Sequence, residues 1–201
     1  VSSIPALDVV ENTESHAAMQ AAVSEIAAKY GADGVSAAYV RDGQVVDTYA
    51  YGSAVKGVRG MTSNTRVRVA SISKVLVGLA AQLAVEDGSF DLDADLGEYL
   101  GVGIRTRRAG DTVTPRSILT HTSSLTVAPE GTPCDLAAVR QRLTSSAATR
   151  NVLSGNPGNW AYNNYAFSVL GMAVELAEQR TLDEILYESL YGPLHIDAAF
   201  Y

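Results

Sequence analysis

Only two segments of this chain have the residue pattern of β-strands, and they are neighbours in the sequence. Residues 35–41 and 44–51 are rich in Val, Ala and Tyr, and Asp42-Gly43 joins them, which is a strong signal for a tight hairpin. Alternating Arg and Val predict one more extended segment at residues 65–70. Two or three strands can form only a small sheet, so helices are expected to supply most of the fold.

Helical patterns occupy most of the other residues. An alanine-rich amphipathic helix is expected at residues 13–30, and apolar residues three and four positions apart predict a buried helix over residues 71–88. Further helices are expected at residues 115–119, 135–144, 164–179 and 181–190, with Pro115, Asp135 and Thr181 at three of their starts. We therefore expect an α+β fold, with residues 1–69 in an α/β lobe and residues 70–201 in a helical lobe.

The charge balance argues against a nucleic-acid partner. The formal net charge is −7 and the pI is near 4.9, whereas nucleic-acid binding needs a basic face. The one dense basic cluster (Arg105, Arg107 and Arg108) is interpreted as a solvated loop rather than a phosphate or carboxylate site. No run approaches the roughly 18–20 apolar residues that a membrane span needs, so none is expected.

Cysteine and histidine residues indicate neither a disulfide nor a metal site. Cys134 is the only cysteine, which excludes an internal disulfide, and its Pro-Cys-Asp turn is interpreted as inert packing. His16, His121 and His195 are scattered, and no pair has ligand spacing. No metal and no cofactor are expected.

Ser71-Ile72-Ser73-Lys74 spells S-x-x-K at the start of the apolar helix. Residues three apart on a helix share a face, so the Lys74 amine can reach the Ser71 hydroxyl. The positive end of the helix dipole disfavours an ammonium, a neutral amine can take the serine proton, and the Ser71 N–H can help hold an oxyanion. The alternative is an N-capping Ser71 with a solvated Lys74.

A second copy of the motif, Ser53-Ala54-Val55-Lys56, lacks this context. It lies between Gly52 and Gly57 with no apolar helix behind it, and we interpret it as a loop. Helix context, and not spacing alone, therefore supports the assignment of Ser71 and Lys74.

Tyr162-Asn163-Asn164 follows Pro157-Gly158 and precedes another apolar helix. Tyr-x-Asn places a phenol and a carboxamide two residues apart on a turn, so both can point into one cleft. A tyrosine beside a lysine can relay protons, and an amide can bind a substrate's amide carbonyl. The alternative is a buried tyrosine with a capping asparagine.

These segments together resemble the serine β-lactamases of class C, the D-alanyl-D-alanine carboxypeptidases and the β-lactamase-like esterases. The likeness covers nearly the whole chain. Its landmarks, in order, are residues 67–74, Glu86 to Asp93, Thr114 to Ser123, Pro157 to Asn164, and Tyr191 to Leu194.

The resemblance implies the fold of the β-lactamase and transpeptidase enzymes and a role for each site residue. Ser71 would be acylated, Lys74 and Tyr162 would share general-base and general-acid duty, and Asn164 would bind the substrate amide. His121 would hold a turn and Ser124 stands where the family usually has glycine. The substrate would be a small molecule or peptidoglycan-like, and the location extracytoplasmic.

The family's third motif, Lys-Thr-Gly or His-x-Gly on a strand, is not found after Asn164. That strand would supply a second oxyanion donor and the group that meets a substrate carboxylate. We therefore expect the 201 residues to be a fragment whose sheet is incomplete. The hairpin would then expose an edge through which the chain could associate, with itself or with a missing C-terminal portion.

Two functions follow. The first is a serine hydrolase that forms an acyl-enzyme with a β-lactam, a D-alanyl peptide or an ester. The second is a non-catalytic fragment of such an enzyme, which would serve at most as a ligand-binding or assembly module.

Overall fold

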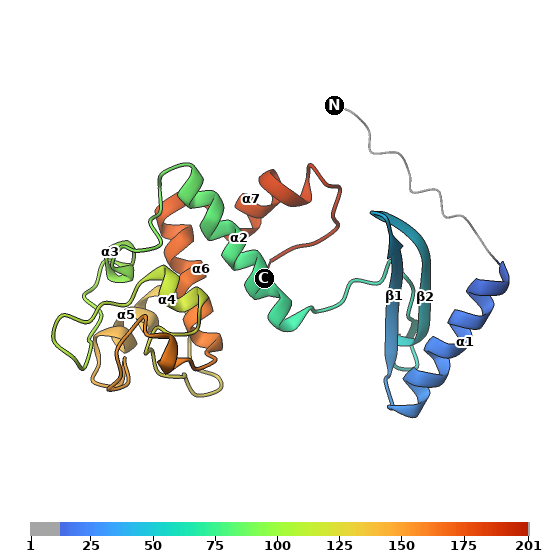
Figure 1. Cartoon of the computed structure of the whole chain (residues 1–201), viewed down its shortest axis with the longest axis horizontal. Coiled ribbons are helices and arrows are strands. Elements are labelled where there is room, and N and C mark those ends of the chain that lie inside the picture. The colour runs from blue at the N-terminus through green and yellow to red at the C-terminus, as the bar shows by residue number, and fades with distance from the viewer. Residues whose placement is uncertain (1–12, 201) are drawn as a thin grey trace. The chain divides into compact units, whose positions relative to one another are not determined.

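The computed structural model describes residues 13–200, which divide into two compact units between Arg68 and Val69. The first unit holds one helix and a small sheet, whereas the second is helical and contains every candidate site residue (Figure 1). Within the described range, no helix is long and apolar enough to cross a membrane.

The first unit contains a three-stranded antiparallel sheet. β1 (Gly34–Arg41) pairs with β2 (Gln44–Val55), and β3 (Arg59–Gly60) pairs with the other edge of β2. Asp42 and Gly43 have φ of 51° and 76°, and a two-residue type I′ hairpin needs positive φ at both positions. The predicted hairpin is confirmed, and β1 has one strand partner in the described part of the chain.

α1 (Thr13–Lys29) packs on β2 through polar contacts. His16 Nδ1 lies 2.8 Å from both carboxylate oxygens of Asp47, and its ring stacks on Tyr49 at a centroid distance of 5.4 Å. The Gln20 amide donates to the Ala50 carbonyl at 2.9 Å.

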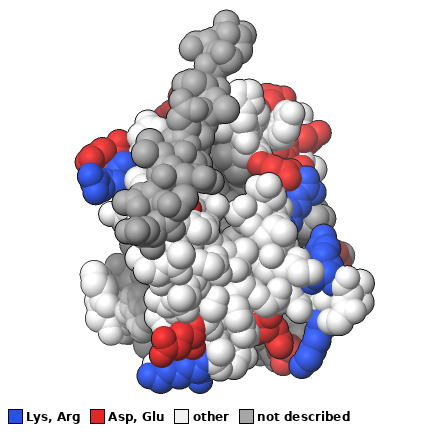
Figure 2. Space-filling view, turned by 90° about the vertical axis from the view of Figure 1, so that its right-hand side faces the viewer, with Lys and Arg blue, Asp and Glu red and all other residues white. Residues whose placement is uncertain are grey.

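Figure 2, viewed from the side on which α1 lies in Figure 1, shows mostly uncharged side chains with charges at the margins.

β2 extends farther than predicted, to Val55. Gly52 has φ of 76°, and a Cβ there would lie 2.2 Å from the Asp33 carbonyl oxygen, so the close approach requires glycine. Ser53 follows in the strand and pairs with Gly60 of β3. The interpretation of Ser53 as a loop residue is therefore wrong.

The second unit consists of helices joined by loops. Its elements are a 3₁₀ turn η1 (Ala70–Ile72), α2 (Ser73–Glu86), α3 (Leu96–Leu100), α4 (Pro115–Leu119), α5 (Leu136–Thr144), a 3₁₀ turn η2 (Pro157–Asn159), α6 (Asn164–Glu178), α7 (Leu182–Leu186) and a π-helical turn η3 (Tyr187–Tyr191).

Two sequence predictions need correction here, and one helix was missed. The segment 65–70 forms no hydrogen-bonded strand, and α3 was not predicted. The helix expected over residues 181–190 is α-helical only to Leu186, and the chain then widens into η3.

Side-chain caps fix where the helices begin. Thr114 and Thr181 each form a capping box, at α4 and α7. Asp135 accepts from the third backbone N–H at the start of α5, and Asn163 does the same at α6. The caps predicted at Asp135 and Thr181 are confirmed.

The core of the second unit forms around the contact between α2 and α6, with α3 and α4 packed on α6 and α7 on both (Figure 1). Gly171 of α6 permits close packing of α7, because a Cβ there would lie 2.9 Å from Leu182 Cδ1. Fully buried apolar residues include Ala80, Ala81, Leu96, Leu100, Val113, Ile118, Val139, Leu170, Val174 and Leu186.

The first turn of α2 is less buried than its apolar sequence predicts. Val75 in this turn exposes 70% of its surface, and Ile72 of the preceding turn η1 exposes 63%, while Val77 and Ala80 are buried. The α2 segment therefore begins exposed, beside the candidate nucleophile, and becomes a core helix farther along.

Candidate active site

Ser71, Lys74 and Tyr162 meet at one point of the second unit. The Ser71 hydroxyl lies 2.6 Å from the Tyr162 phenol oxygen, and the Lys74 ammonium donates to Ser71 Oγ at 3.1 Å. Lys74 Nζ also lies 4.8 Å from the centre of the Tyr162 ring. A hydroxyl held by both an amine and a phenol is an arrangement from which a nucleophile can lose its proton.

The local backbone places Ser71 in η1, directly before the start of α2. Ala70 has φ of 44°, which is uncommon for a residue with a side chain, and it opens the 3₁₀ turn that contains Ser71. The α-helix begins at Ser73, two positions later than predicted. Residues three apart eclipse each other in 3₁₀ geometry, so the turn still brings Lys74 over Ser71.

The surroundings of the Tyr162 hydroxyl make its ionisation easier. Interaction with the Lys74 side chain, and then the hydrogen bond to Ser71, lower the pKa of the Tyr162 phenol below its ordinary value. Lys74 therefore stabilises negative charge on Tyr162, while Tyr162 remains 43% exposed and open to a ligand.

His121 supports this cluster from behind. Its ring packs against Tyr162 and Phe167 at centroid distances of 4.6 and 5.0 Å, and its Nδ1 accepts from the Asn163 N–H at 3.2 Å. Burial, and then the charge of Lys74, lower the pKa of His121, which favours the neutral ring that this contact needs.

The two asparagines at the start of α6 have different roles. Asn163 is buried, accepts from the Ala166 N–H at 3.2 Å as N-cap, and donates to the Leu125 carbonyl at 3.0 Å. Asn164 is exposed and faces the groove that contains Ser71. The capping role considered for the Tyr-x-Asn motif thus belongs to its middle residue, and Asn164 is free to meet a ligand.

A groove of about 850 Å³ contains Ser71, Lys74 and Asn164. One wall is a stripe along α6 of residues three and four positions apart, which runs about 16 Å at 1.5 Å per residue. The stripe consists of Asn164, Phe167, Ser168, Gly171, Met172 and Glu175. Of these residues only Asn164 was predicted to belong to the site, although the helical spacing from it identifies the others.

Cys134 also lines this groove and is exposed, so its interpretation as a packing residue is wrong. Arg107 donates to the carbonyls of Thr149 and Ser146 at 2.9 and 2.6 Å. That arginine therefore connects its own loop to the loop that contains Ser146 and Thr149.

In the range 13–200, no three His, Cys, Asp or Glu side chains gather closely enough to hold a metal ion.

Comparison with known proteins gives a consistent result. A family model described as Beta-lactamase matches residues 19–201. The octameric penicillin-binding protein homologue from Pyrococcus abyssi superposes with a TM-score of 0.75 and 21% identity, over 90% of this chain and 43% of that chain. A class C beta-lactamase gives 0.72 and 20%, over 93% and 52%.

The D-amino acid amidase from Ochrobactrum anthropi SV3 gives a TM-score of 0.72 and 22% identity, over 90% of this chain and 50% of that chain. At these identities the likeness to solved structures shows the fold alone. The chain spans about half the length of the structures that it matches.

Proposed function

The chain belongs to the beta-lactamase family, and on this premise we propose that it carries the nucleophile of a serine hydrolase that works through an acyl-enzyme. The resemblance found in the sequence is confirmed at the level of family and fold. The observation that supports the proposal is the contact of one hydroxyl, Ser71 Oγ, with both the Lys74 ammonium and the Tyr162 phenol.

In the proposed reaction, Ser71 Oγ attacks the carbonyl carbon of a β-lactam, a D-alanyl peptide or an ester. The Oγ–C bond forms, the Oγ proton passes to a base, and the C–N or C–O bond to the leaving group breaks as that proton is returned to the departing atom. Water then attacks the acyl ester, and the same base accepts and returns a proton. Asn164 would hold the amide carbonyl of the substrate beside Ser71.

We assign the base to the Tyr162 phenol oxygen, whose ionisation the neighbouring Lys74 side chain favours. This assignment is supported by the lowered pKa of Tyr162, whose chief cause is Lys74. It differs from the expectation that a neutral Lys74 amine takes the proton. Catalysis requires the base to lie within hydrogen-bond reach of the nucleophile, and at 2.6 Å the phenol oxygen meets that condition.

The substrate class and the location rest on the family. We propose a small-molecule or peptidoglycan-like substrate, an extracytoplasmic location, and association through the free edge of β1. The two units would correspond to the α/β lobe and the helical lobe. Turnover needs oxyanion donors besides the Ser71 N–H, and the alternative function is binding of a ligand without turnover.

The direct test of the nucleophile is intact-mass measurement after incubation with benzylpenicillin. We expect one covalent adduct that maps to Ser71 and is lost in Ser71→Ala. Ser53→Ala is the matched control, because Ser53 has the same S-x-x-K spacing but lies in a strand, and it should retain the adduct. No adduct at any concentration would contradict acylation by this chain and favour the non-catalytic alternative.

The test of the base uses two conservative changes. Tyr162→Phe should abolish adduct formation, because it removes only the phenol oxygen. Lys74→Arg should leave slow acylation, because the guanidinium keeps the positive charge that stabilises the phenolate. Complete loss in Lys74→Arg, with folding intact by circular dichroism, would instead make the neutral Lys74 amine the base.

A further inference from the structure

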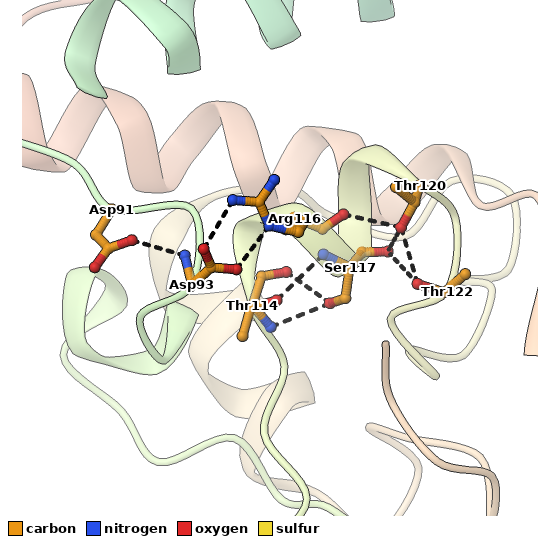
Figure 3. A network of polar contacts seen from close by, with 7 residues as sticks. All are labelled: Asp91, Asp93, Thr114, Arg116, Ser117, Thr120 and Thr122. Atoms are coloured by element: carbon orange, nitrogen blue, oxygen red, sulfur yellow. Dashed lines mark hydrogen bonds and ion pairs between the residues drawn. The ribbon is translucent and has the colours of Figure 1, made fainter. Parts of the chain in front are cut away.

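A second hollow lies in the helical unit and shares no residue with the groove at Ser71. Its volume is about 510 Å³, within the range of roughly 300–1,000 Å³ that is usual for small-molecule sites. The residues that line it are Asp93, Thr114, Arg116, Ser117, Thr120, Thr122, Gly155, Pro157 and Trp160. Figure 3 shows the polar contacts among the charged and hydroxyl-bearing residues of this lining, together with the neighbouring Asp91.

The charges in this hollow cancel. Arg116 Nε and Nη2 donate to the two oxygens of Asp93 at 2.7 Å each, in a bidentate pair. With one cation and one anion among the lining residues, the hollow has no net charge. An anionic ligand would have to compete with Asp93 for Arg116, and a cationic ligand with Arg116 for Asp93, so an uncharged ligand is favoured.

The apolar part of the lining is the side chain of a tryptophan. Trp160 exposes 62% of its surface, although large aromatic side chains are usually well buried. Its ring meets the edge of His121 at a centroid distance of 6.0 Å, which limits the orientations it can adopt. The ring thus offers an apolar platform with a fixed support.

Hydroxyl groups on α4 and after it complete the lining. Thr120 Oγ1 donates to the Arg116 carbonyl at 2.9 Å and lies 2.9 Å from Thr122 Oγ1, while Ser117 and Thr122 are buried (Figure 3). Their positions are therefore fixed before any ligand arrives. Each hydroxyl retains acceptor capacity, and the paired carboxylate and guanidinium add an acceptor and a donor side by side.

We propose that this hollow binds a neutral saccharide. A pyranose ring has an apolar face of C–H groups that can stack on Trp160, and its hydroxyls both donate and accept as the Asp93–Arg116 pair and the threonines require. A flat apolar ligand would cover the Asp93–Arg116 pair and the Thr120 hydroxyl and would offer no hydrogen bond in place of the water that it displaces, which lowers affinity. The site does not depend on chemistry at Ser71.

Tryptophan fluorescence tests this directly, because Trp160 is the only tryptophan of the chain. Titration of the full chain with N-acetylglucosamine and its β-1,4-linked disaccharide should change the emission saturably, with a dissociation constant on the order of 1 mM or below. Ser71→Ala should bind equally well. A failure of the proposed hydrolysis would leave this result unchanged, which separates the two proposals.

Variants are measured by calorimetry, so that loss of the fluorophore does not matter. Trp160→Ala should weaken saccharide binding at least tenfold, whereas Tyr187→Ala, an equally exposed aromatic outside the hollow, should not. Asp93→Asn should weaken it similarly and create sulfate binding at the unpaired Arg116. The matched control is Glu188→Gln, which breaks the exposed Arg180–Glu188 pair elsewhere on this unit.

Three outcomes would overturn the proposal. These are no saturable signal at about ten times the expected dissociation constant, binding that is unchanged in Trp160→Ala, and binding of sulfate in preference to saccharide by the unmodified chain.

Discussion

At the scale of single residues, Ser124 stands out as a position that works against folding. It is buried, has φ of 60°, and its hydroxyl has no hydrogen-bond partner among the described residues. A residue with a side chain disfavours the left-handed region by about 1–2 kcal/mol, and an unsatisfied buried hydroxyl costs roughly 1–3 kcal/mol. The backbone conformation and the unpaired hydroxyl of Ser124 therefore both lower the stability of the folded state.

We therefore expect Ser124→Gly to raise the free energy of unfolding by about 1 kcal/mol, after the entropy that glycine adds to the unfolded chain is subtracted. Chemical denaturation measures the change. Ser123→Gly is the matched control, because Ser123 is buried but its φ is not positive, and it should destabilise. Equal effects of the two changes would contradict the backbone explanation.

His121 gives a prediction for pH. Its pKa is lowered in the folded protein, so the unfolded chain binds more protons there and stability falls as the pH drops through the unfolded value near 6.5. Protonation also removes the Nδ1 acceptor that holds the Asn163 N–H.

We expect unfolding curves between about pH 7.5 and 5.5 to show a loss of stability that His121→Gln lacks. The carboxylates titrate in both proteins, and their contribution cancels in the difference between them. If the two proteins lose stability in parallel, His121 is not the responsible group.

At the scale of the elements, the start of α6 separates structure from binding. Asn163 supplies the helix cap and the hydrogen bond to Leu125, whereas Asn164, one position on, is exposed in the groove. The tripeptide Tyr162-Asn163-Asn164 therefore both starts the helix, through Asn163, and supplies its first and last residues to the site.

We predict that Asn163→Ala lowers the free energy of unfolding by about 2 kcal/mol or more, from a lost cap worth roughly 0.5–2 kcal/mol and a lost buried hydrogen bond. Asn164→Ala should change stability by less than about 0.5 kcal/mol, as expected for an exposed position. Thermal and chemical unfolding of both variants provide the measurement. If Asn164→Ala is destabilised as much as Asn163→Ala, the assignment of the capping role to Asn163 alone is wrong.

At the scale of the whole molecule, the apolar core belongs to the second unit. The main cluster of buried residues runs from Val77 onward, whereas in the described part of the first unit only Ala27 and Tyr49 are buried apolar residues. A small sheet and one helix that bury so little apolar surface are marginal in water.

We expect residues 69–201 expressed alone to unfold in one cooperative transition, and residues 1–68 expressed alone to show none. Circular dichroism during heating tests both. A cooperative transition in the shorter piece would show that the sheet and α1 are sufficient by themselves, contrary to this reasoning.

Local chemistry let the sequence predict much of this protein. Asp42-Gly43 specified its turn because the φ angles belong to those two residues, and the caps at Asp135 and Thr181 act within one helical turn. The S-x-x-K spacing placed Lys74 near Ser71 for the same reason. Family and α+β fold were also predicted correctly, from landmarks spread along the chain.

Only the tertiary structure decided which distant groups meet. Tyr162 lies 91 positions from Ser71 in the sequence, yet its phenol contacts the Ser71 hydroxyl, because the two residues directly precede α6 and α2, which pack on each other. The structure also shows that Cys134 is exposed, that β2 continues through Ser53, and that Asn163 is the N-cap of α6. Local preferences act within about four residues, whereas burial depends on the sum of contacts across the chain, so no single segment could reveal these outcomes.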